Sequence, residues 1–480
     1  MSEDTPRKER APGMKLLFVA LIGAVLTVPL LLIYALVYDR QDQSQTAQSA
    51  INAGWGGAQV VAGPVIVVPF RTTQTQNEEI GGKAVTRTVE VEKYLYISPT
   101  ENRAITAIAP QERAKSIYRS VLYEAKVSGK ASFTLPDDLP RFEVTRERLL
   151  WDRAQLRMGV SDARGLTTGG SLSANGKVLL LQPGKGPAAT GGEGFFAFLP
   201  WDGEGTLEIG YGFGLRGSRS LSLVPRGGQT SWEVSSSWTS PSFNGDFLPE
   251  KPDISDKGFK ASYTVDKLAL GQAPVMMEDP GPPSISVDYG GGNRAMEAAA
   301  SASDPASGSA VEMVGGPSRA LSIDLIEPVN LYSKVTRAVK YGFLFIGFTF
   351  LAFLLFDIVG GARVAAAEYL LTGAGLILFF VLLLAFAEVI GFTPAYLLAS
   401  GSIIGLLTAY SAAVLGSWAR ARFIGALLVG LYALLFVLLN LEAWSLLIGA
   451  VLLFAALAGV MYATRNVDWG AVGRRELPEA

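Results

Sequence analysis

Six long apolar stretches constrain this chain more than any motif, because each can cross a lipid bilayer as a helix. A membrane-spanning helix needs about 20 apolar residues to cross a hydrocarbon core about 30 Å thick. One stretch, residues 16–38, stands alone near the start of the chain, and five more follow between 341 and 464. The sequence therefore predicts a membrane protein with six α-helical spans, one before and five after a large domain at residues 39–340.

The five later spans are predicted at residues 341–356, 369–387, 389–419, 423–441 and 443–464. The first of them is short, but its helix can extend past Asp357 while Lys340 snorkels toward water. Stretch 389–419 is longer than one span needs, so we expect its helix to begin near Pro394. Glu388 and Glu442 are then expected in short loops between spans.

The amino-acid composition excludes several classes of function. The chain is 49% hydrophobic and 18% charged, and it contains neither Cys nor His. The absence of Cys removes disulfides, thiol nucleophiles, iron–sulfur clusters and the usual structural zinc sites. The absence of His removes the commonest general base and metal ligand. With a net charge of −2 and no basic patch, the chain gives no reason to expect nucleic acid as a partner, and we expect no cofactor and no metal.

Basic residues flank the spans unevenly, and Lys and Arg near spans tend to stay in the cytoplasm. They gather in the N-terminal segment 1–15, in the loop at Arg420 and Arg422, and in the tail 465–480. We therefore predict that both termini are cytoplasmic and that the domain at 39–340 is exported. Stretch 16–38 is predicted to be an uncleaved anchor, because the apolar core of a signal peptide is normally about 7–15 residues long.

The domain at 39–340 has a dominant hydrophobic period of two, which is typical of strands with one face on a core. The clearest runs are 117–133, 207–215 and 232–238. Gly-Gly, Pro-Gly and Asp-Gly turn signals lie between such runs. We expect a β-rich domain built as a sandwich or as two packed sheets.

One segment of this domain has the composition of a disordered loop. Residues 290–316 contain a glycine run and a stretch rich in Ala and Ser. Such a segment cannot bury enough apolar surface to offset the entropy lost on ordering. We predict that 290–316 is a disordered surface loop.

Two local patterns suggest catalysis or nucleotide binding but have simpler explanations. The glycine-rich segment 54–64 precedes a predicted strand and not a helix, so tight turns explain it better than a phosphate loop. Asp137 and Asp138 are adjacent acids of the kind that turns ordinarily contain. No serine has a His to activate it, so we predict no catalytic residue and no enzyme.

Three carboxylates near the spans are the candidate functional residues: Glu388, Glu442 and Asp357. A charge at mid-bilayer costs at least about 2.5–3.5 kcal/mol, so such residues often mark paths for protons or ions. All three are expected at the ends of spans, where water and headgroups can solvate them. An interfacial loop position is therefore the alternative reading for each.

Six segments spread over most of the chain have a recognisable order and spacing. They are GGAQVVAGPVIVVP (56–69), RAKSIYRSVLYEA (113–125), WTSPSFNGDFLP (238–249), PVNLYSKVTRAVKYG (328–342), LAFAEVIGF (384–392) and TRNVDW (464–469). Together with one span, a large domain and five further spans, they resemble the CreD family of bacterial inner-membrane proteins.

The resemblance implies an inner-membrane protein with a periplasmic β-rich domain, linked to envelope integrity, colicin tolerance and the response to β-lactams. It brings no catalytic residue and no cofactor. The chain departs from the family pattern at Val389, where members often have His, and at residues 365–368, where others have His-Pro. A proton relay built on those histidines is therefore in doubt for this chain.

The sequence leaves competing functions open. The first is a non-enzymatic envelope protein whose domain binds a periplasmic or cell-wall partner while the helices contact the lipid bilayer. The second is a transporter or channel for small molecules or ions that uses the five later helices. A hydrolase is a third reading, which the lack of His and Cys disfavours. The identity of the partner, the oligomeric state and any transported molecule stay open.

Overall fold

The computed structural model describes residues 12–80, 83–115, 118–137, 139–142, 144–167, 169–284, 317–325, 331–358, 364–440 and 445–465. The predicted loop 290–316 and the candidate Glu442 lie outside these residues. The chain divides into two compact units. The first comprises Met1–Thr46 with Val329–Ala480, and the second comprises Ala47–Pro328.

The first unit is helical. Its elements are α1 (Pro12–Ala53, which ends in the second unit), α4 (Leu331–Lys340), α5 (Gly342–Ile358), α6 (Ala366–Ile390), α7 (Phe392–Val414), α8 (Trp418–Asn440) and α9 (Ser445–Thr464). Among the described residues, α1, α4 with α5, α6, α7 and α8 are apolar and long enough to cross a membrane, and α9 is a further apolar helix of 20 residues. The prediction of a membrane protein with one span followed by five is confirmed.

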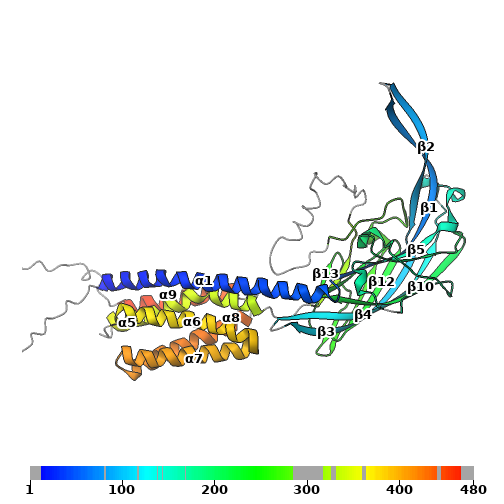
Figure 1. The fold of residues 1–480 in the computed structure, drawn as a ribbon. Coiled ribbons are helices and arrows are strands. Elements are labelled where there is room, and N and C mark those ends of the chain that lie inside the picture. The colour runs from blue at the N-terminus through cyan, green and yellow to red at the C-terminus, as the bar shows by residue number, and fades with distance from the viewer. Residues whose placement is uncertain are drawn as a thin grey trace, which may run out of the picture. The chain divides into compact units, whose positions relative to one another are not determined.

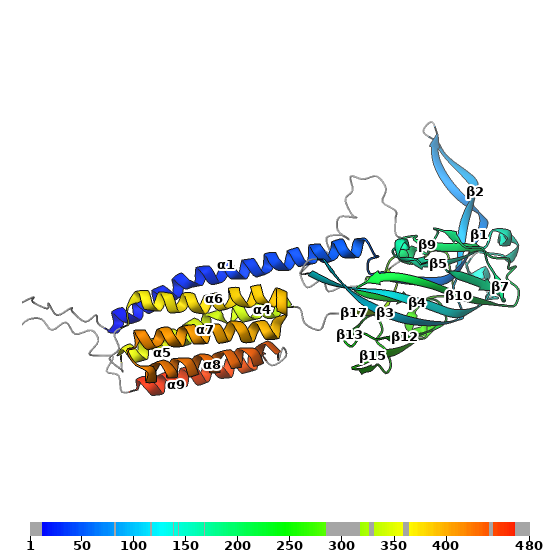
Figure 2. The same cartoon turned by 60° about the horizontal axis from the view of Figure 1, so that its bottom comes forward.

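An aromatic cluster joins three of these helices to α5 inside the bundle. The ring of Phe379 on α6 lies 4.6 Å from Tyr432 on α8 and 5.5 Å from Tyr396 on α7. Phe345 on α5 lies 5.0 Å from Tyr432, and the Tyr396 hydroxyl donates to the Tyr432 carbonyl at 2.6 Å. Figures 1 and 2 show α5, α6, α7 and α8 running side by side.

The turn between α6 and α7 differs from the sequence expectation. We expected Glu388 in a short loop, but α6 continues through Ile390, so Glu388 lies in its last turn. Only Gly391 separates α6 from α7, and its positive φ of +82°, which glycine adopts without strain, ends the helix. A charged residue near water does not itself stop a helix. Pro394 lies in the first turn of α7, where proline is tolerated.

The second unit contains two β-sheets. The nine-stranded sheet has the order β13 (Pro241–Gly245), β17 (Leu321–Leu325), β11 (Ser220–Val224), β1 (Gln59–Ile80), β5 (Gln155–Val160), β9 (Gly194–Phe198) and β8 (Gln182–Pro183), with β2 (Lys83–Ile97) on β1 and β16 (Val275–Met276) on β2. The eight-stranded sheet has the order β14 (Asp253–Ser255), β15 (Gly258–Val265), β12 (Gln229–Ser236), β3 (Glu101–Lys115), β4 (Tyr118–Thr134), β10 (Thr206–Ser218), β6 (Ser171–Ala174) and β7 (Lys177–Val178).

Short helical segments connect these strands. They are α2 (Lys267–Leu270) and the 3₁₀ turns Leu139–Phe142, Arg146–Arg148, Trp151–Arg153, Ala163–Gly165 and Ala188–Thr190. Most strand pairs are antiparallel, whereas β1 with β11 and β12 with β3 are parallel.

The two sheets pack face to face around one apolar core. Ile66, Leu95 and Leu156 enter it from the nine-stranded sheet, and Tyr123 and Trp232 enter it from the eight-stranded sheet. The alternating residues of β4 and β10 lie in this core, as the period of two predicted. The run at 232–238 forms a strand only to Ser236. The expectation of two packed sheets is therefore confirmed.

The first and last strands of this domain lie close together. Gln59, near the start of β1, is paired with Leu221 on β11, and Leu221 is paired with Ile323 near the end of β17. Adjacent strands lie about 4.8 Å apart, so the start of β1 and the end of β17 lie roughly 10 Å apart in the sheet.

The hairpin of β1 and β2 extends beyond the sheet as a two-stranded ribbon, which Figures 1 and 2 show leaving the rest of the domain. Its pairing runs without interruption from Ile66 with Ile97 to Ile80 with Lys83. Past Phe70 on β1, and from Leu95 back to Lys83 on β2, no third described strand pairs with either edge.

Helix packing gives a first testable prediction. A Cβ on Gly425 in α8 would lie 2.8 Å from Thr408 Oγ1 on α7, whereas a Cβ on Gly430 would meet nothing within 4 Å. We therefore expect Gly425→Leu to lower the free energy of unfolding of the bundle by about 1–3 kcal/mol and to reduce the amount of protein in the membrane. Gly430→Leu, a matched change on the same helix, should be tolerated. Equal losses in thermal unfolding of the two purified variants would contradict this packing.

Candidate functional site

The helix α4 is amphipathic, and its apolar face is buried on the helical bundle. Tyr332, Val335, Ala338 and Val339 are its buried residues, spaced so that they share one face. Lys and Arg residues at 334, 337 and 340 lie between them in the sequence. This spacing of apolar and basic residues was visible in the sequence and is the signal that could have located α4 as a separate helix.

Glu388, the first of the sequence candidates, lies against α4. It is half-buried, and its Oε1 accepts a hydrogen bond from the Tyr332 hydroxyl at 3.2 Å. Tyr332 is 9% exposed. The carboxylate therefore holds a helix in place and does not stand alone in a loop.

A second polar contact holds α4 at the ends of α7 and α8. Lys334 Nζ donates to Asn440 Oδ1 at 3.0 Å and lies 5.0 Å from the centre of the Phe392 ring. Asn440 Nδ2 in turn donates to the carbonyl of Phe436 at 2.8 Å. We call Tyr332, Lys334, Glu388, Phe392 and Asn440 the α4 clamp.

The other two sequence candidates do not join the α4 clamp. Asp357 is 6% exposed and lies in the last turn of α5, so it is buried in protein and not solvated as expected. The chain passes from there to the start of α6, whereas Glu388 lies 22 residues farther along that helix, a rise of about 33 Å. Glu442 lies outside the described residues. The structure therefore brings Glu388 and Asp357 to opposite ends of α6.

The side chains of the α4 clamp suit the holding of a helix better than catalysis or metal binding. Among the residues that the structure describes, no three Asp or Glu side chains are grouped so that they could hold a metal ion. A phenol, one carboxylate, an amide and a lysine over an aromatic ring can hold a helix by hydrogen bonds and a cation–π contact. The arrangement suits positioning of α4, which is the helix that follows the β-rich domain in the chain.

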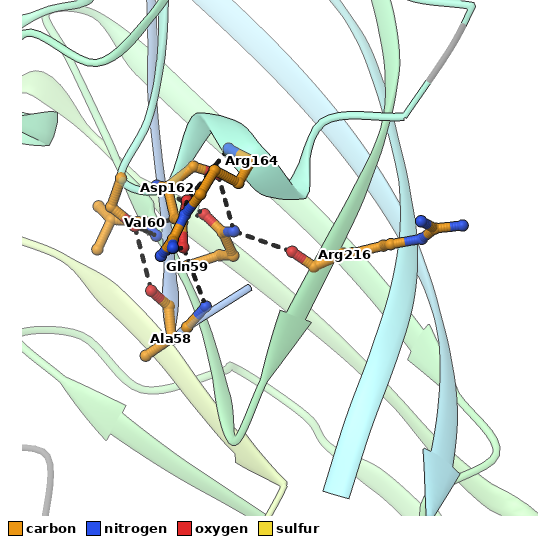
Figure 3. Close-up of polar contacts among 8 residues, drawn as sticks. Ala58, Gln59, Val60, Asp162, Arg164 and Arg216 are labelled. Atoms are coloured by element: carbon orange, nitrogen blue, oxygen red, sulfur yellow. Dashed lines mark hydrogen bonds and ion pairs between the residues drawn. The ribbon is translucent and has the colours of Figure 1, made fainter. Parts of the chain in front are cut away.

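A separate polar cluster fixes the start of β1 in the β-rich domain (Figure 3). The side chain of Gln59 is fully buried, and its Nε2 donates to the carbonyls of Arg216 at 2.9 Å and Asp162 at 3.2 Å. Its Oε1 accepts from the Asp162 N–H at 3.2 Å and from Ser161 Oγ at 3.3 Å. Both the nitrogen and the oxygen of this amide therefore have hydrogen-bond partners. We call Gln59, Ser161, Asp162 and Arg164 the strand-entry cluster.

Asp162 carries the charge in the strand-entry cluster. It accepts from Arg164 Nε at 2.9 Å and Nη2 at 2.8 Å, and from the Gly57 N–H at 3.3 Å. The hydrogen bond from Arg164 lowers the pKa of Asp162, and the backbone N–H groups act in the same direction. In the glycine-rich segment 54–64, residues 54–58 form the turn that the sequence indicated, and residues 59–64 belong to β1.

Comparison with known proteins places the chain in one family over nearly its whole length. A sequence model described as "Inner membrane protein CreD" matches residues 11–470. The curated protein "Inner membrane protein CreD" of Escherichia coli (strain K12) is 30% identical over 464 residues, which cover 94% of this chain and 93% of that protein.

Likeness to solved structures is slight. An M1 zinc metallopeptidase from Deinococcus radiodurans aligns with a TM-score of 0.18 and 5% identity, over 35% of this chain and 38% of that one. A mutant of the same enzyme gives a TM-score of 0.19 and 6% identity over the same shares. Similarity at this level indicates nothing about activity.

The charge of Asp162 gives a prediction about pH. Because its pKa is lowered in the folded state, the carboxylate adds stability that is present above its ordinary pKa of 3.8 and is lost as the pH falls through the lowered value. At pH 7 we expect Asp162→Asn to lower the free energy of unfolding by about 1 kcal/mol, since solvent screens the exposed Arg164. Thermal unfolding of the purified chain should show this difference shrinking below pH 3.8. The exposed Asp152→Asn should change little at any pH.

Proposed function

Because the chain belongs to the CreD family of inner membrane proteins, we propose that it is a non-enzymatic protein that supports the integrity of the cell envelope. In this proposal both termini lie in the cytoplasm and the β-rich domain lies in the periplasm. There the domain binds an envelope partner, a periplasmic or cell-wall protein, and takes part in the response to envelope stress, antibiotics or colicins.

One observation carries the proposal: the β-rich domain is inserted between apolar helices, with α1 before it and α4 and α5 after it. Six apolar helices can anchor the protein in the membrane by themselves, so the two-sheet domain is not needed for anchoring. The sequence offers no His or Cys for catalysis. Binding is therefore the use that its size and chemistry favour.

The α4 clamp supports a role for the helices beyond anchoring. The chain leaves β17 and, after residues 326–330, enters α4. The contacts of Tyr332 with Glu388 and of Lys334 with Asn440 hold that helix on the bundle. When the β-rich domain binds its partner, α4 is the helix through which the end of the domain is connected along the chain to the later membrane spans.

A transporter or channel is the second candidate, and buried hydroxyl groups favour it. In the described part of the bundle, the hydroxyls of Thr349, Tyr369, Thr372 and Tyr432 are buried without a hydrogen-bond partner. An unsatisfied hydroxyl away from water costs about 1–3 kcal/mol, so water or a polar solute inside the bundle would stabilise them. Asp357 is buried in the same unit.

The proposed orientation is tested with a reporter that is active only in the periplasm. Fused after Gly290 it should be active, and fused after Trp418 or at Ala480 it should be silent, because six crossings return the chain to its starting side. Activity at Ala480 would mean that the number of crossings is wrong.

Complementation of the envelope defect of a deletion strain tests the function. A chain in which a Gly/Ser linker of about 10 residues replaces Ala47–Pro328 should insert but fail to complement, since the proposal assigns binding to the removed domain. Glu388→Gln with Glu442→Gln, at normal abundance, should complement fully.

The linker variant removes the β-rich domain, and the double Gln variant removes two carboxylate charges. They therefore distinguish the envelope-binding protein from the transporter. Glu388→Gln keeps an oxygen that can accept from Tyr332 and removes only the charge that proton or cation movement would need. Complementation by the linker variant, or its loss in the double Gln variant at normal protein level, would favour the transporter.

A further inference from the structure

The face of the nine-stranded sheet that points away from the core carries a polar cluster. Ile66 and Val68 enter the core, so Val65 and Val67 point to the opposite face of β1. Tyr96 on β2 and Gln155 on β5 are both paired with Val67, and Arg157 is paired with Val65. Since paired residues share a face, Tyr96, Gln155 and Arg157 lie together there.

A buried ion pair between Arg226 and Asp279 adjoins these residues. The side chains are 2% and 7% exposed, and Asp279 Oδ2 also accepts from the Ala188 N–H at 2.6 Å. Burial and the charge of Asp279 raise the pKa of Tyr96, while Arg157 and Arg226 act in the opposite direction. All three charges therefore lie near the Tyr96 hydroxyl.

The ion pair leaves donors unused. Arg226 bonds to Asp279 through Nη2, and its Nε and Nη1 are buried with no hydrogen-bond partner. Ser98 Oγ is also buried and unpartnered. A Cβ on Gly227, which has φ +65°, would collide with the Ser98 side chain, so Ser98 lies beside the residue that follows Arg226. We call Tyr96, Ser98, Arg157, Arg226 and Asp279 the Arg226 cluster.

The Arg226 cluster has an excess positive charge. Arg157 is half-buried and donates through Nε and Nη2 to Gln155 Oε1, at 3.1 Å and 2.9 Å. It forms no ion pair with any described carboxylate. The cluster therefore contains two positive charges, on Arg157 and Arg226, and one negative charge, on Asp279. Burial lowers the pKa of Arg157, because desolvation disfavours its charged form, while the charge of Asp279 acts in the opposite direction.

We propose that the Arg226 cluster binds an oxyanion, the carboxylate or phosphate group of an envelope ligand. Such a group offers acceptors for one of the unused Arg226 donors and for Ser98 Oγ, and its charge balances Arg157. A buried water would satisfy the same donors but leave the excess charge. The half-buried Tyr96 and Arg157, and Tyr94, which is 41% exposed, mark the side from which solvent reaches the cluster.

This inference deepens the proposed function, because it names the ligand chemistry of the β-rich domain. Its test is separate from complementation, since it measures binding to the purified full-length chain in detergent. Inorganic phosphate and acetate are titrated at constant ionic strength against chloride, with the heat of binding as the readout. Saturable binding of one of them above chloride is expected, and the tighter anion identifies the ligand as phosphate-bearing or carboxylate-bearing.

Three variants show whether the binding occurs at the Arg226 cluster. Arg157→Gln should weaken it at least tenfold. Ser98→Ala should weaken it severalfold without lowering the melting temperature of the unliganded chain, because the hydroxyl it removes has no partner. Arg153→Gln removes the same charge from an exposed arginine that pairs with Glu92 at 2.7 Å, and should leave the affinity within twofold.

The proposal is overturned if neither anion binds saturably, or if Arg157→Gln and Arg153→Gln weaken binding equally. Either result would leave the complementation test of the proposed function unaffected, because that test does not depend on the nature of the ligand.

Discussion

The hydrocarbon core of a bilayer offers the backbone no hydrogen-bond partner, and this constraint divides the chain. Where apolar stretches enter the membrane, the backbone forms helices that satisfy their own N–H and C=O groups. Two serine side chains of α7 are satisfied in the same way. Ser400 donates to the carbonyl of Tyr396 at 2.7 Å and Ser411 to that of Leu407 at 2.6 Å, both within α7. The segment between the first and second spans is free of this constraint and forms sheets.

The two polar clusters of the β-rich domain differ in how completely their hydrogen bonds are made. In the strand-entry cluster, Gln59 uses both its donor and its acceptor atoms on neighbouring groups, which is how a buried amide stabilises a fold. In the Arg226 cluster, two guanidinium donors and a serine hydroxyl are left over. The buried amide of the first cluster has all its hydrogen-bonding atoms partnered within the protein, whereas the donors of the second need an acceptor from outside it.

Local sequence patterns predicted the helices and strands well. They could not predict features that depend on contacts between residues far apart in the sequence. The alternation of β4 and β10 follows from residues two apart, so the sequence contains it directly. The pairing of β11 with β17 joins residues about a hundred positions apart, and no local pattern encodes it. The same holds for the candidate site: Glu388 was identified as a carboxylate near a span, but its partner Tyr332 is 56 residues away. Likewise, Arg226 looks in the sequence like any surface arginine, and only the fold buries it.

The ribbon of β1 and β2 sets how far the β-rich domain can reach. From Phe70 to Ile80 the strand rises by roughly 34 Å at about 3.4 Å per residue, with β2 as its one partner among the described strands along that length. An isolated two-stranded hairpin is only marginally stable in water, so beyond Phe70 the ribbon depends on its ladder with β2. Its residues as far as Ile80 and Lys83 extend roughly 34 Å beyond Phe70, and this distance is set by one hairpin and is independent of the size of the sandwich that carries it.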